Sequence, residues 1–223
     1  MELLDRDDIP MEDIKRNMQE LDSINKWLGG HRITIAGLKL LLGDKKTMQH
    51  HILEIGCGGG DNLRVIKKYC EANNIDATYT GIDINPHCIA FARSRSENSG
   101  INFIASDYRT AVLNNKPTII FSSLFCHHFS EEVLPGQIQW MQANSSVGFF
   151  INDLHRHPFA YYSIKWITRC LSASYLVKND APLSVLRSFL KKELMDICHK
   201  AGVHDAKIFW KWAFRWLLIF RHA

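Results

Sequence analysis

The sequence predicts an α/β fold in which helices pack around a mostly parallel β-sheet. Short apolar segments alternate along the chain with segments whose apolar residues recur every three or four positions, as in amphipathic helices. This alternation is typical of right-handed βαβ units. The 223 residues suffice for one domain of this class, or for one domain with a modest insertion. We therefore expect a single domain that spans residues 1–223.

Two helices are expected before the first strand. Apolar residues spaced three or four apart predict an amphipathic helix over residues 11–28, and Gly29 and Gly30 are expected to end it. A second helix is expected over residues 33–42. We interpret residues 1–45 as an N-terminal helical cap on the domain.

The middle of the chain carries the regular alternation of elements. Strands are predicted at residues 51–55, 78–84, 101–105, 118–124 and 147–152, and helices at residues 61–71, 86–96 and 131–143. Several of these strands are nearly continuous apolar runs, which is expected of parallel strands covered on both faces.

The pattern is less regular after Asp153. Helices are expected over residues 159–176 and 183–200, and the aromatic-rich tail at 207–221 is expected to form a strand antiparallel to its neighbours. A membrane-surface helix is the alternative for the tail. Residues 155–182 follow the fifth strand, and we interpret them as an inserted substrate lid. An ordinary core-facing helix explains their apolar pattern equally well.

The composition is that of a soluble globular protein. The net charge of +4 is small and dispersed, which argues against nucleic acid as the main partner. None of the six cysteines forms a C-x-x-C pair, so we expect reduced thiols and no metal site. The opening residues do not resemble a signal peptide, and no apolar run reaches the roughly 18 residues that a membrane span needs. We expect a cytoplasmic protein; the sequence does not indicate its oligomeric state.

A glycine-rich turn follows the first predicted strand. Its glycines are Gly56, Gly58 and Gly60. Glycine reaches positive φ and has no Cβ, so a ligand can lie directly against the backbone. The dinucleotide fingerprint G-x-G-x-x-G would require glycine at position 61, which is Asp61. Two carboxylates, Glu54 and Asp61, flank the turn and favour a cationic ligand group over a pyrophosphate.

Acidic residues also end the next two strands. Asp83 follows the second strand and could accept hydrogen bonds from both hydroxyls of a ribose, each worth roughly 1.5–3 kcal/mol. Asp107 and Tyr108 follow the third strand. A solvated carboxylate at Asp83 and a helix N-cap at Asp107 are the alternatives that involve no ligand. Because these strand ends meet at one edge of a parallel sheet, Glu54, Asp83 and Asp107 are expected to face one crevice.

The glycine turn, with Glu54 before it, resembles the first motif of class I S-adenosylmethionine-dependent methyltransferases. The resemblance covers residues 52–153 well, and residues 20–31 resemble the leading helix of small bacterial members, which packs over the cofactor. It implies a Rossmann-like three-layer sandwich with a mostly parallel seven-stranded sheet and an antiparallel terminal strand. In this family an acidic residue at the position of Asp107 hydrogen-bonds the adenine. The implied cofactor-binding residues are Glu54, Gly56, Cys57, Gly58, Gly60, Asp83, Ile84, Asp107 and Tyr108.

Candidates for the acceptor side follow the fourth and fifth strands. His127 and His128 end the fourth strand, where an imidazole could take a proton or orient a hydroxyl, or could simply pack against the next helix. The segment from Asn152 resembles the Asn-Asp-Leu-x-Arg segment of methyltransferases that act on small hydrophobic or polyketide-like molecules. Its Asp153 and Arg156 are expected to line the acceptor pocket with His155; alternatively, Arg156 pairs with Asp153. The candidate catalytic residues are His127, His128, Asp153 and Arg156.

The sequence therefore predicts a methyltransferase that uses S-adenosylmethionine to methylate oxygen or carbon of a small aromatic or polyketide-like molecule. No Asn-Pro-Pro-Tyr segment, typical of adenine amino methyltransferases, follows the fourth strand. The alternatives are a nicotinamide-dependent oxidoreductase, a non-catalytic cofactor-binding protein, and a methyltransferase acting on RNA.

Overall fold

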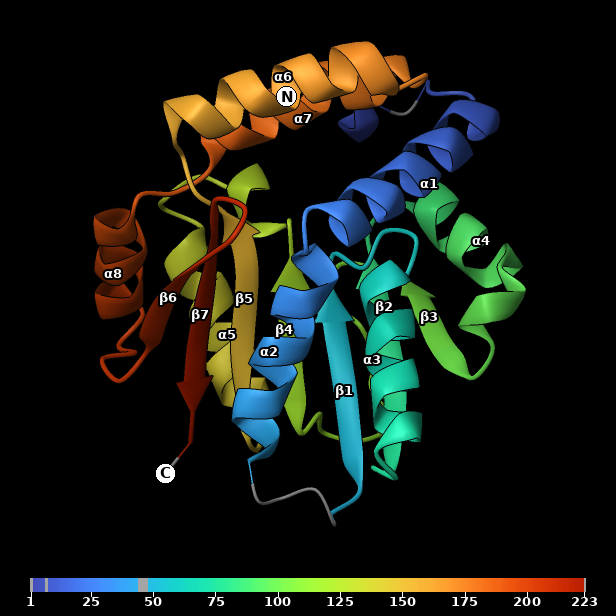
Figure 1. Ribbon diagram of the computed structural model, residues 1–223. Coiled ribbons are helices and arrows are strands. Elements are labelled where there is room, and N and C mark those ends of the chain that lie inside the picture. The colour runs from blue at the N-terminus through green and yellow to red at the C-terminus, as the bar shows by residue number, and fades with distance from the viewer. Residues whose placement is uncertain (1, 7, 44–47, 223) are drawn as a thin grey trace.

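The computed structural model describes residues 2–6, 8–43 and 48–222 and contains one seven-stranded sheet (Figure 1). The spatial order of the strands is β3-β2-β1-β4-β5-β7-β6. Their bounds are β1 His50–Ile55, β2 Ala77–Asp83, β3 Ile101–Ala105, β4 Ile119–Ser123, β5 Gly148–Leu154, β6 Lys207–Lys211 and β7 Arg215–Arg221. Strands β1 to β5 pair in parallel, whereas β7 pairs antiparallel with both β5 and β6. The mostly parallel sheet with an antiparallel C-terminal strand is confirmed.

The strand order indicates where a ligand would bind. Strand β1 lies between β2 and β4. The chain runs from β1 through β2 to β3 at one edge of the sheet, whereas β4 and the later strands extend toward the other edge. Open α/β sheets bind ligands beyond the carboxyl ends of the strands at such a switch point. The glycine turn, which follows β1, therefore lies where a ligand is expected.

Helices cover both faces of the sheet and complete three layers (Figure 1). One layer contains α2 Gly30–Leu42, α3 Asp61–Ala72 and α4 Pro86–Ser94; the other contains α5 Leu134–Asn144 and α8 Lys191–Lys200. Successive residues of a strand point to opposite faces, so Ile119 and Phe121 pack into the first layer and Ile120 into the second. This two-sided burial explains the apolar strands of the sequence.

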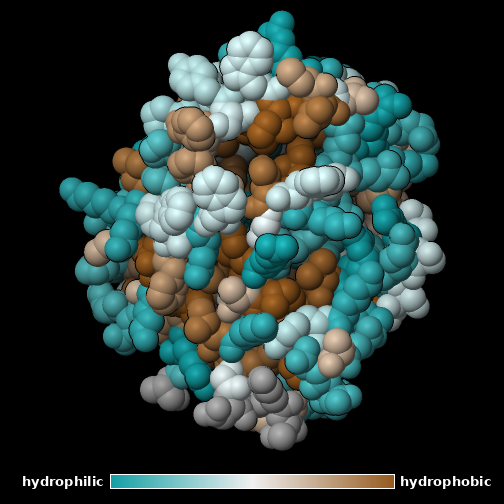
Figure 2. All heavy atoms as spheres, in the orientation of Figure 1, coloured by the Kyte–Doolittle hydropathy of each residue, from teal (hydrophilic) through white to brown (hydrophobic). Residues whose placement is uncertain are grey.

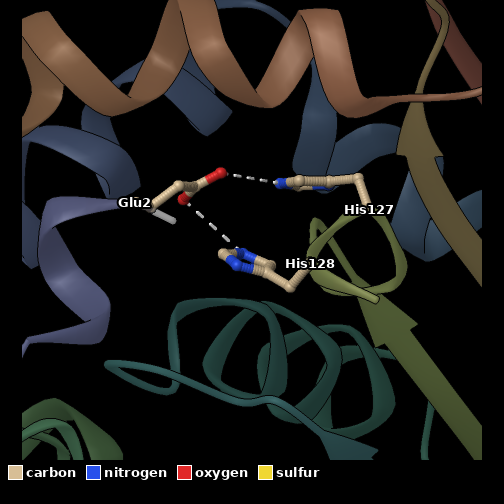
Figure 3. Close-up of side chains that lie close together, drawn as sticks. All are labelled: Glu2, His127 and His128. Carbon is tan, nitrogen blue, oxygen red and sulfur yellow. Dashed lines mark ion pairs between the residues drawn. The ribbon is translucent and has the colours of Figure 1, made fainter. Parts of the chain in front are cut away.

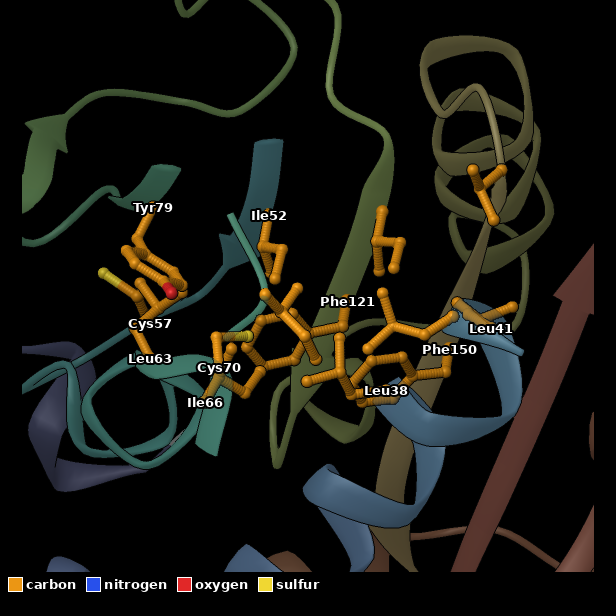
Figure 4. Packing of buried hydrophobic residues seen from close by; sticks show 14 of the residues in the cluster. Leu38, Leu41, Ile52, Cys57, Leu63, Ile66, Cys70, Tyr79, Phe121 and Phe150 are labelled. Carbon is orange, nitrogen blue, oxygen red and sulfur yellow. The ribbon is translucent and has the colours of Figure 1, made fainter. Parts of the chain in front are cut away.

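The rings of Phe121 and Phe150 stack at the centre of the first layer, with their centroids 4.9 Å apart (Figure 4). Leu38 and Leu41 of α2 are fully buried there. Burial of one such side chain contributes roughly 1.5–3 kcal/mol. Helix α2 comes close enough for these contacts because Gly37 faces the Phe150 ring without a side chain of its own.

Three further helices, α1 Met11–Trp27, α6 Pro158–Leu171 and α7 Tyr175–Arg187, lie across the carboxyl edge of the strands (Figure 1). Apolar side chains reach the surface where α6 lies (Figure 2). Phe159, Tyr162 and Trp166 are all more than half exposed. These aromatic side chains are therefore largely exposed to solvent. The interpretation of residues 155–182 as a lid stays a prediction.

Two predicted helices have different bounds. The expected helix over 159–176 ends at Leu171, and α7 begins at Tyr175 with Ser174 as its N-cap. The expected helix over 183–200 is broken between Arg187 and Lys191. The break occurs because the backbone of Phe189 hydrogen-bonds to the segment after β5 and to the Trp216 indole. These contacts come from residues remote in the sequence, so periodicity could not indicate them.

The aromatic tail forms a hairpin and not the single strand that was expected. Strands β6 and β7 are joined by a turn at residues 212–214, where Phe214 has φ 53°. Trp212 lies in this turn and is 69% exposed, whereas Trp216 is buried in β7. The hairpin supplies the seventh strand. Within the described residues, no helix is both long and apolar enough to span a bilayer.

We expect Gly37→Ala to destabilise the protein. A Cβ at this position would lie 2.6 Å from a Phe150 ring carbon. The ring is buried and stacked, so relieving the overlap should lower the free energy of unfolding by about 1–3 kcal/mol. Thermal unfolding followed by circular dichroism would measure the loss, which corresponds to roughly 2–4 °C per kcal/mol.

Gly136→Ala is the matched control. Gly136 also lies in a helix, but a Cβ there would meet no atom within 4 Å. Alanine should leave the stability unchanged or raise it by up to about 1 kcal/mol. Equal stability of the two variants would contradict the packing of α2 against Phe150.

Candidate functional site

The glycine turn connects the carboxyl end of β1 to α3. Gly56, Gly58 and Gly60 all have positive φ, which other residues rarely adopt. The Phe125 ring packs directly against Gly56, where an added Cβ would lie 2.1 Å from a ring carbon. Asn98 donates a hydrogen bond of 3.1 Å to the carbonyl of Gly59. The turn is thus fixed in shape and presents bare backbone at the switch point.

Asp83, at the end of β2, is tied to this turn. Its carboxylate accepts hydrogen bonds from the backbone N–H of Gly58 at 2.8 Å and of Asn85 at 2.9 Å. Burial raises the pKa of Asp83 above its ordinary value, although these hydrogen bonds act in the opposite direction. An ionised carboxylate offers about four acceptor positions, so Asp83 keeps acceptor capacity for a further donor. A pair of adjacent hydroxyls fits this capacity.

Glu54 ends β1 beneath the turn. Its side chain is 1% exposed, and Oε2 has no hydrogen-bond partner among the described residues. Burial, and secondly the nearby Asp61, raise the pKa of Glu54 well above its ordinary value. A buried carboxylate without a full set of partners is costly. A cationic ligand group above the turn would relieve this cost.

Asp61, the first residue of α3, joins the turn to the N-terminal helices. Its Oδ2 lies 2.7 Å from Nε2 of His31 and accepts a 3.2 Å hydrogen bond from Asn25. Burial alone would raise the pKa of Asp61, but the contact with His31 outweighs it and the pKa is lowered. The end of α1 and the start of α2 therefore cover the turn, as the resemblance over residues 20–31 implied.

The other predicted cofactor residues take different environments. Ile84 is 73% exposed beside Asp83, and Tyr108 is buried with its ring 4.9 Å from that of Trp140. Asp107 accepts hydrogen bonds of 3.0 Å from the Arg109 guanidinium, and its Oδ1 also caps a turn through the Arg109 N–H. The side chain of Cys57 packs into the core, which leaves only its backbone at the turn.

The structure pairs two of the predicted catalytic residues, His127 and Asp153. Nδ1 of His127 donates a 2.7 Å hydrogen bond to Oδ1 of Asp153, and both side chains are almost fully buried. Burial alone would lower the pKa of His127, but the charge and hydrogen bond of Asp153 outweigh it and raise the pKa. Conversely, His127 lowers the pKa of Asp153 against the effect of burial. The two form a buried ion pair.

His128 stacks on His127, with ring centroids 4.6 Å apart, and is less deeply buried. Both rings face Glu2, whose carboxylate oxygens lie 3.7 Å from Nε2 of each histidine (Figure 3). Glu2 is only 5% exposed. It was not among the predicted site residues, since no local motif marks it and it lies far from the histidines in the sequence.

Arg156 does not pair with Asp153, as one interpretation of the sequence had it. It forms an ion pair with Glu193 of α8 and lines a cavity of about 260 Å³ together with His127 and Arg187. His155 accepts a hydrogen bond from the Trp210 indole. Asp153 is already hydrogen-bonded to His127, and Arg156 instead pairs with Glu193 of α8.

Arg215, at the start of β7, was also missed. Its guanidinium is 2% exposed and donates a 2.9 Å hydrogen bond to Asn25. Burial lowers the pKa of Arg215 to about 10, so the side chain stays charged at neutral pH. Nothing in the aromatic tail marks this residue, because its role depends on a contact 190 positions away.

Comparison with known proteins identifies the central part of the chain. Residues 52–144 match the model of a family described as a methyltransferase domain. A malonyl-[acyl-carrier protein] O-methyltransferase from Acetivibrio thermocellus is 34% identical over 80 residues, which is 36% of this chain and 27% of that protein. The match thus spans little more than a quarter of the relative.

Solved methyltransferase structures share the fold over most of the chain. Plantazolicin methyltransferase with bound S-adenosylhomocysteine has a TM-score of 0.65 and 19% identity, covering 88% of this chain and 74% of its own. Human N-acetylserotonin methyltransferase with bound S-adenosylmethionine has a TM-score of 0.67 and 14% identity, covering 96% and 57%. The Synechocystis magnesium protoporphyrin IX methyltransferase has a TM-score of 0.57 and 13% identity, covering 87% and 84%.

The buried Glu54, the bare glycine backbone and the spare acceptor positions of Asp83 fit the ammonium, sulfonium and ribose of S-adenosylmethionine. A nicotinamide dinucleotide fits less well, because its pyrophosphate would meet the Asp61 carboxylate. With the family match at residues 52–144 and the shared fold, the chain is similar to the class I S-adenosylmethionine-dependent methyltransferases.

Proposed function

We propose that this protein transfers the methyl group of S-adenosylmethionine to an oxygen or carbon atom of a small aromatic or polyketide-like molecule. The observation that carries the proposal is the joining of the ends of β1 and β2 at one glycine turn. Gly58 donates to Asp83, and Glu54 lies buried beneath the same turn. Each of these groups has a defined partner in the cofactor.

Bound S-adenosylmethionine supplies a methyl group that its sulfonium has already activated. Asp83 would hold the ribose hydroxyls, and Glu54 would balance the positive charge of the methionyl part. Ile84 and Tyr108 would offer apolar surface to the adenine, and Asp107 would have to share its carboxylate with Arg109. The protein then contributes alignment and exclusion of water, which can amount to roughly 7–11 kcal/mol of the barrier.

His127 and His128 follow β4 at the same edge of the sheet, below α7. Asp153 orients the His127 ring by accepting its Nδ1–H, so Nε2 points toward Glu2. His128 is the more exposed of the two and is suited to contact an acceptor. We assign this pair to the acceptor side, with Asp153 as a positioning residue.

The similar proteins support a small acceptor. One is described as acting on a malonyl-acyl carrier protein, and others on plantazolicin, N-acetylserotonin and magnesium protoporphyrin IX. Their acceptors differ widely, so the fold alone does not select among them. Incubation with S-adenosylmethionine and a panel of phenols, polyketides and carboxylic acids, with S-adenosylhomocysteine release as readout, tests the proposal. Cofactor binding without turnover on any of them would contradict it.

Asp83→Ala should weaken binding of S-adenosylhomocysteine by about 100-fold or more, because it removes two charge-assisted hydrogen bonds that are each worth roughly 1.5–3 kcal/mol. Isothermal titration calorimetry measures the change. Asp196→Ala, an exposed acid on α8, is the control and should bind normally. Near-normal affinity of the Asp83 variant with an unchanged circular dichroism spectrum would refute the assignment.

Asp153→Asn should destabilise the protein in a pH-dependent way. The lowered pKa of Asp153 contributes stability that is present above its unfolded value, near pH 4, and is lost as the pH falls through the folded value. The raised pKa of His127 contributes stability that is present below about pH 6.5 and is lost as the pH rises through the folded value. The loss, about 3 kcal/mol for a broken buried pair, should therefore be greatest at about pH 4–6.5.

Urea unfolding of the wild type and the variant at pH 5 and pH 9 measures this difference. Glu193→Gln, which removes the partner of Arg156, serves as the control because it leaves the histidine pair intact. A stability difference that is the same at both pH values would show that no His127–Asp153 ion pair exists.

A further inference from the structure

The carboxylate of Glu2 lies against both His127 and His128 (Figure 3). Oε1 lies 3.7 Å from Nε2 of His127, and Oε2 lies 3.7 Å from Nε2 of His128. The two rings are stacked with only 28° between their planes. Each imidazole therefore faces its own oxygen of one carboxylate.

Helix α7 holds Glu2 in this place. Ser184 donates a 2.8 Å hydrogen bond to Oε1 of Glu2. The backbone N–H groups of Leu3 and Leu4 donate to the Asp180 carboxylate at 2.8 Å and 3.1 Å. The segment is thus attached to α7 through a few polar contacts and covers the histidines from above.

The surroundings of His127 favour an anion. The ion pair with Asp153 raises the pKa of His127, which keeps a positive charge beside the Glu2 oxygen. The adjoining cavity of about 260 Å³ is lined by Arg156 and Arg187 as well as His127. Nη1 of Arg187 is buried and has no hydrogen-bond partner among the described residues. An acidic molecule entering this cavity would meet a donor that the protein itself leaves unused.

We propose that His127 and His128 form a binding site for the carboxylate of an acidic methyl acceptor, and that Glu2 occupies this site until the acceptor displaces it. The inference rests on the proposed function and narrows its substrate class to carboxylic acids. The carboxylate of Glu2 is the same chemical group that the acceptor would present to the two histidines.

A metal ion is the other ligand that these three side chains could hold, since their ligand atoms lie within 4.8 Å of one another. The stacking argues against it. An imidazole nitrogen binds a metal in the plane of its ring, and two nearly parallel rings direct their nitrogens side by side instead of toward one point. Side-by-side nitrogens match the two oxygens of a carboxylate.

Binding of benzoate tests the proposal, with benzamide as the uncharged counterpart. A tethered carboxylate competes at an effective concentration in the millimolar range, so Glu2→Ala should bind benzoate about tenfold more tightly than the wild type. Glu2→Gln should show a similar gain. Glu12→Ala, which removes an exposed acid from α1, should show none. His128→Ala in the Glu2→Ala background should abolish the gain.

The proposal is wrong if Glu2→Ala gains no affinity for benzoate, or if benzamide gains as much. Tight zinc binding by the wild type that disappears in Glu2→Ala would also overturn it. S-adenosylhomocysteine is titrated into the same samples. If S-adenosylhomocysteine binds normally but benzoate shows no effect, only the proposed carboxylate site is refuted. If the wild type does not bind S-adenosylhomocysteine, the proposed function is refuted.

Discussion

The hydrogen bond from Gly58 to Asp83 is the constraint on which the site depends. It ties the turn after β1 to the end of β2 and so converts two neighbouring strand ends into one binding edge. The turn can donate this hydrogen bond because Gly58 has φ 48°, a conformation that a side chain would disfavour. Asn98 fixes the next carbonyl of the turn. The bare backbone and the carboxylate are therefore held in position by the protein's own hydrogen bonds.

Buried charges at this edge are balanced across long stretches of sequence. Asp61 contacts His31, and Asp153 contacts His127. Arg215 donates a hydrogen bond to Asn25 and interacts electrostatically with both Asp153 and Asp61. Breaking one member of such a buried set leaves an uncompensated charge, which typically costs about 3–5 kcal/mol. The N-terminal helices are thus held over the glycine turn by electrostatics as well as by apolar packing. Glu54 is the exception, because its Oε2 has no hydrogen-bond partner among the described residues.

The sequence predicted the central elements well, because β1 to β5 are buried on both faces and each ends in a recognisable turn. The glycine turn, Asp83 and His127–His128 follow β1, β2 and β4 as the sequence predicted, for the same reason, and their roles in binding and catalysis stay predictions. The errors lie after Asp153, where Phe189 breaks a helix and Phe214 turns the tail into a hairpin. Glu2 and Arg215 were missed because their partners are more than a hundred positions away, and no local pattern encodes such a contact.

The two sides of the site are mechanically connected. Glu20 of α1 accepts 3.0 Å hydrogen bonds from the backbone N–H groups of Ala173 and Ser174, in the short segment between α6 and α7. The same helix α1 contributes Asn25, which binds both Asp61 at the glycine turn and Arg215. A movement of α6 and α7 away from α1 must break the Glu20 contacts. Displacement of Glu2 would remove one attachment of α7, through Ser184, while Glu20 keeps another. Helix α1, which contacts the glycine turn through Asn25, is therefore also attached to the start of α7, and His127 and His128 lie below α7.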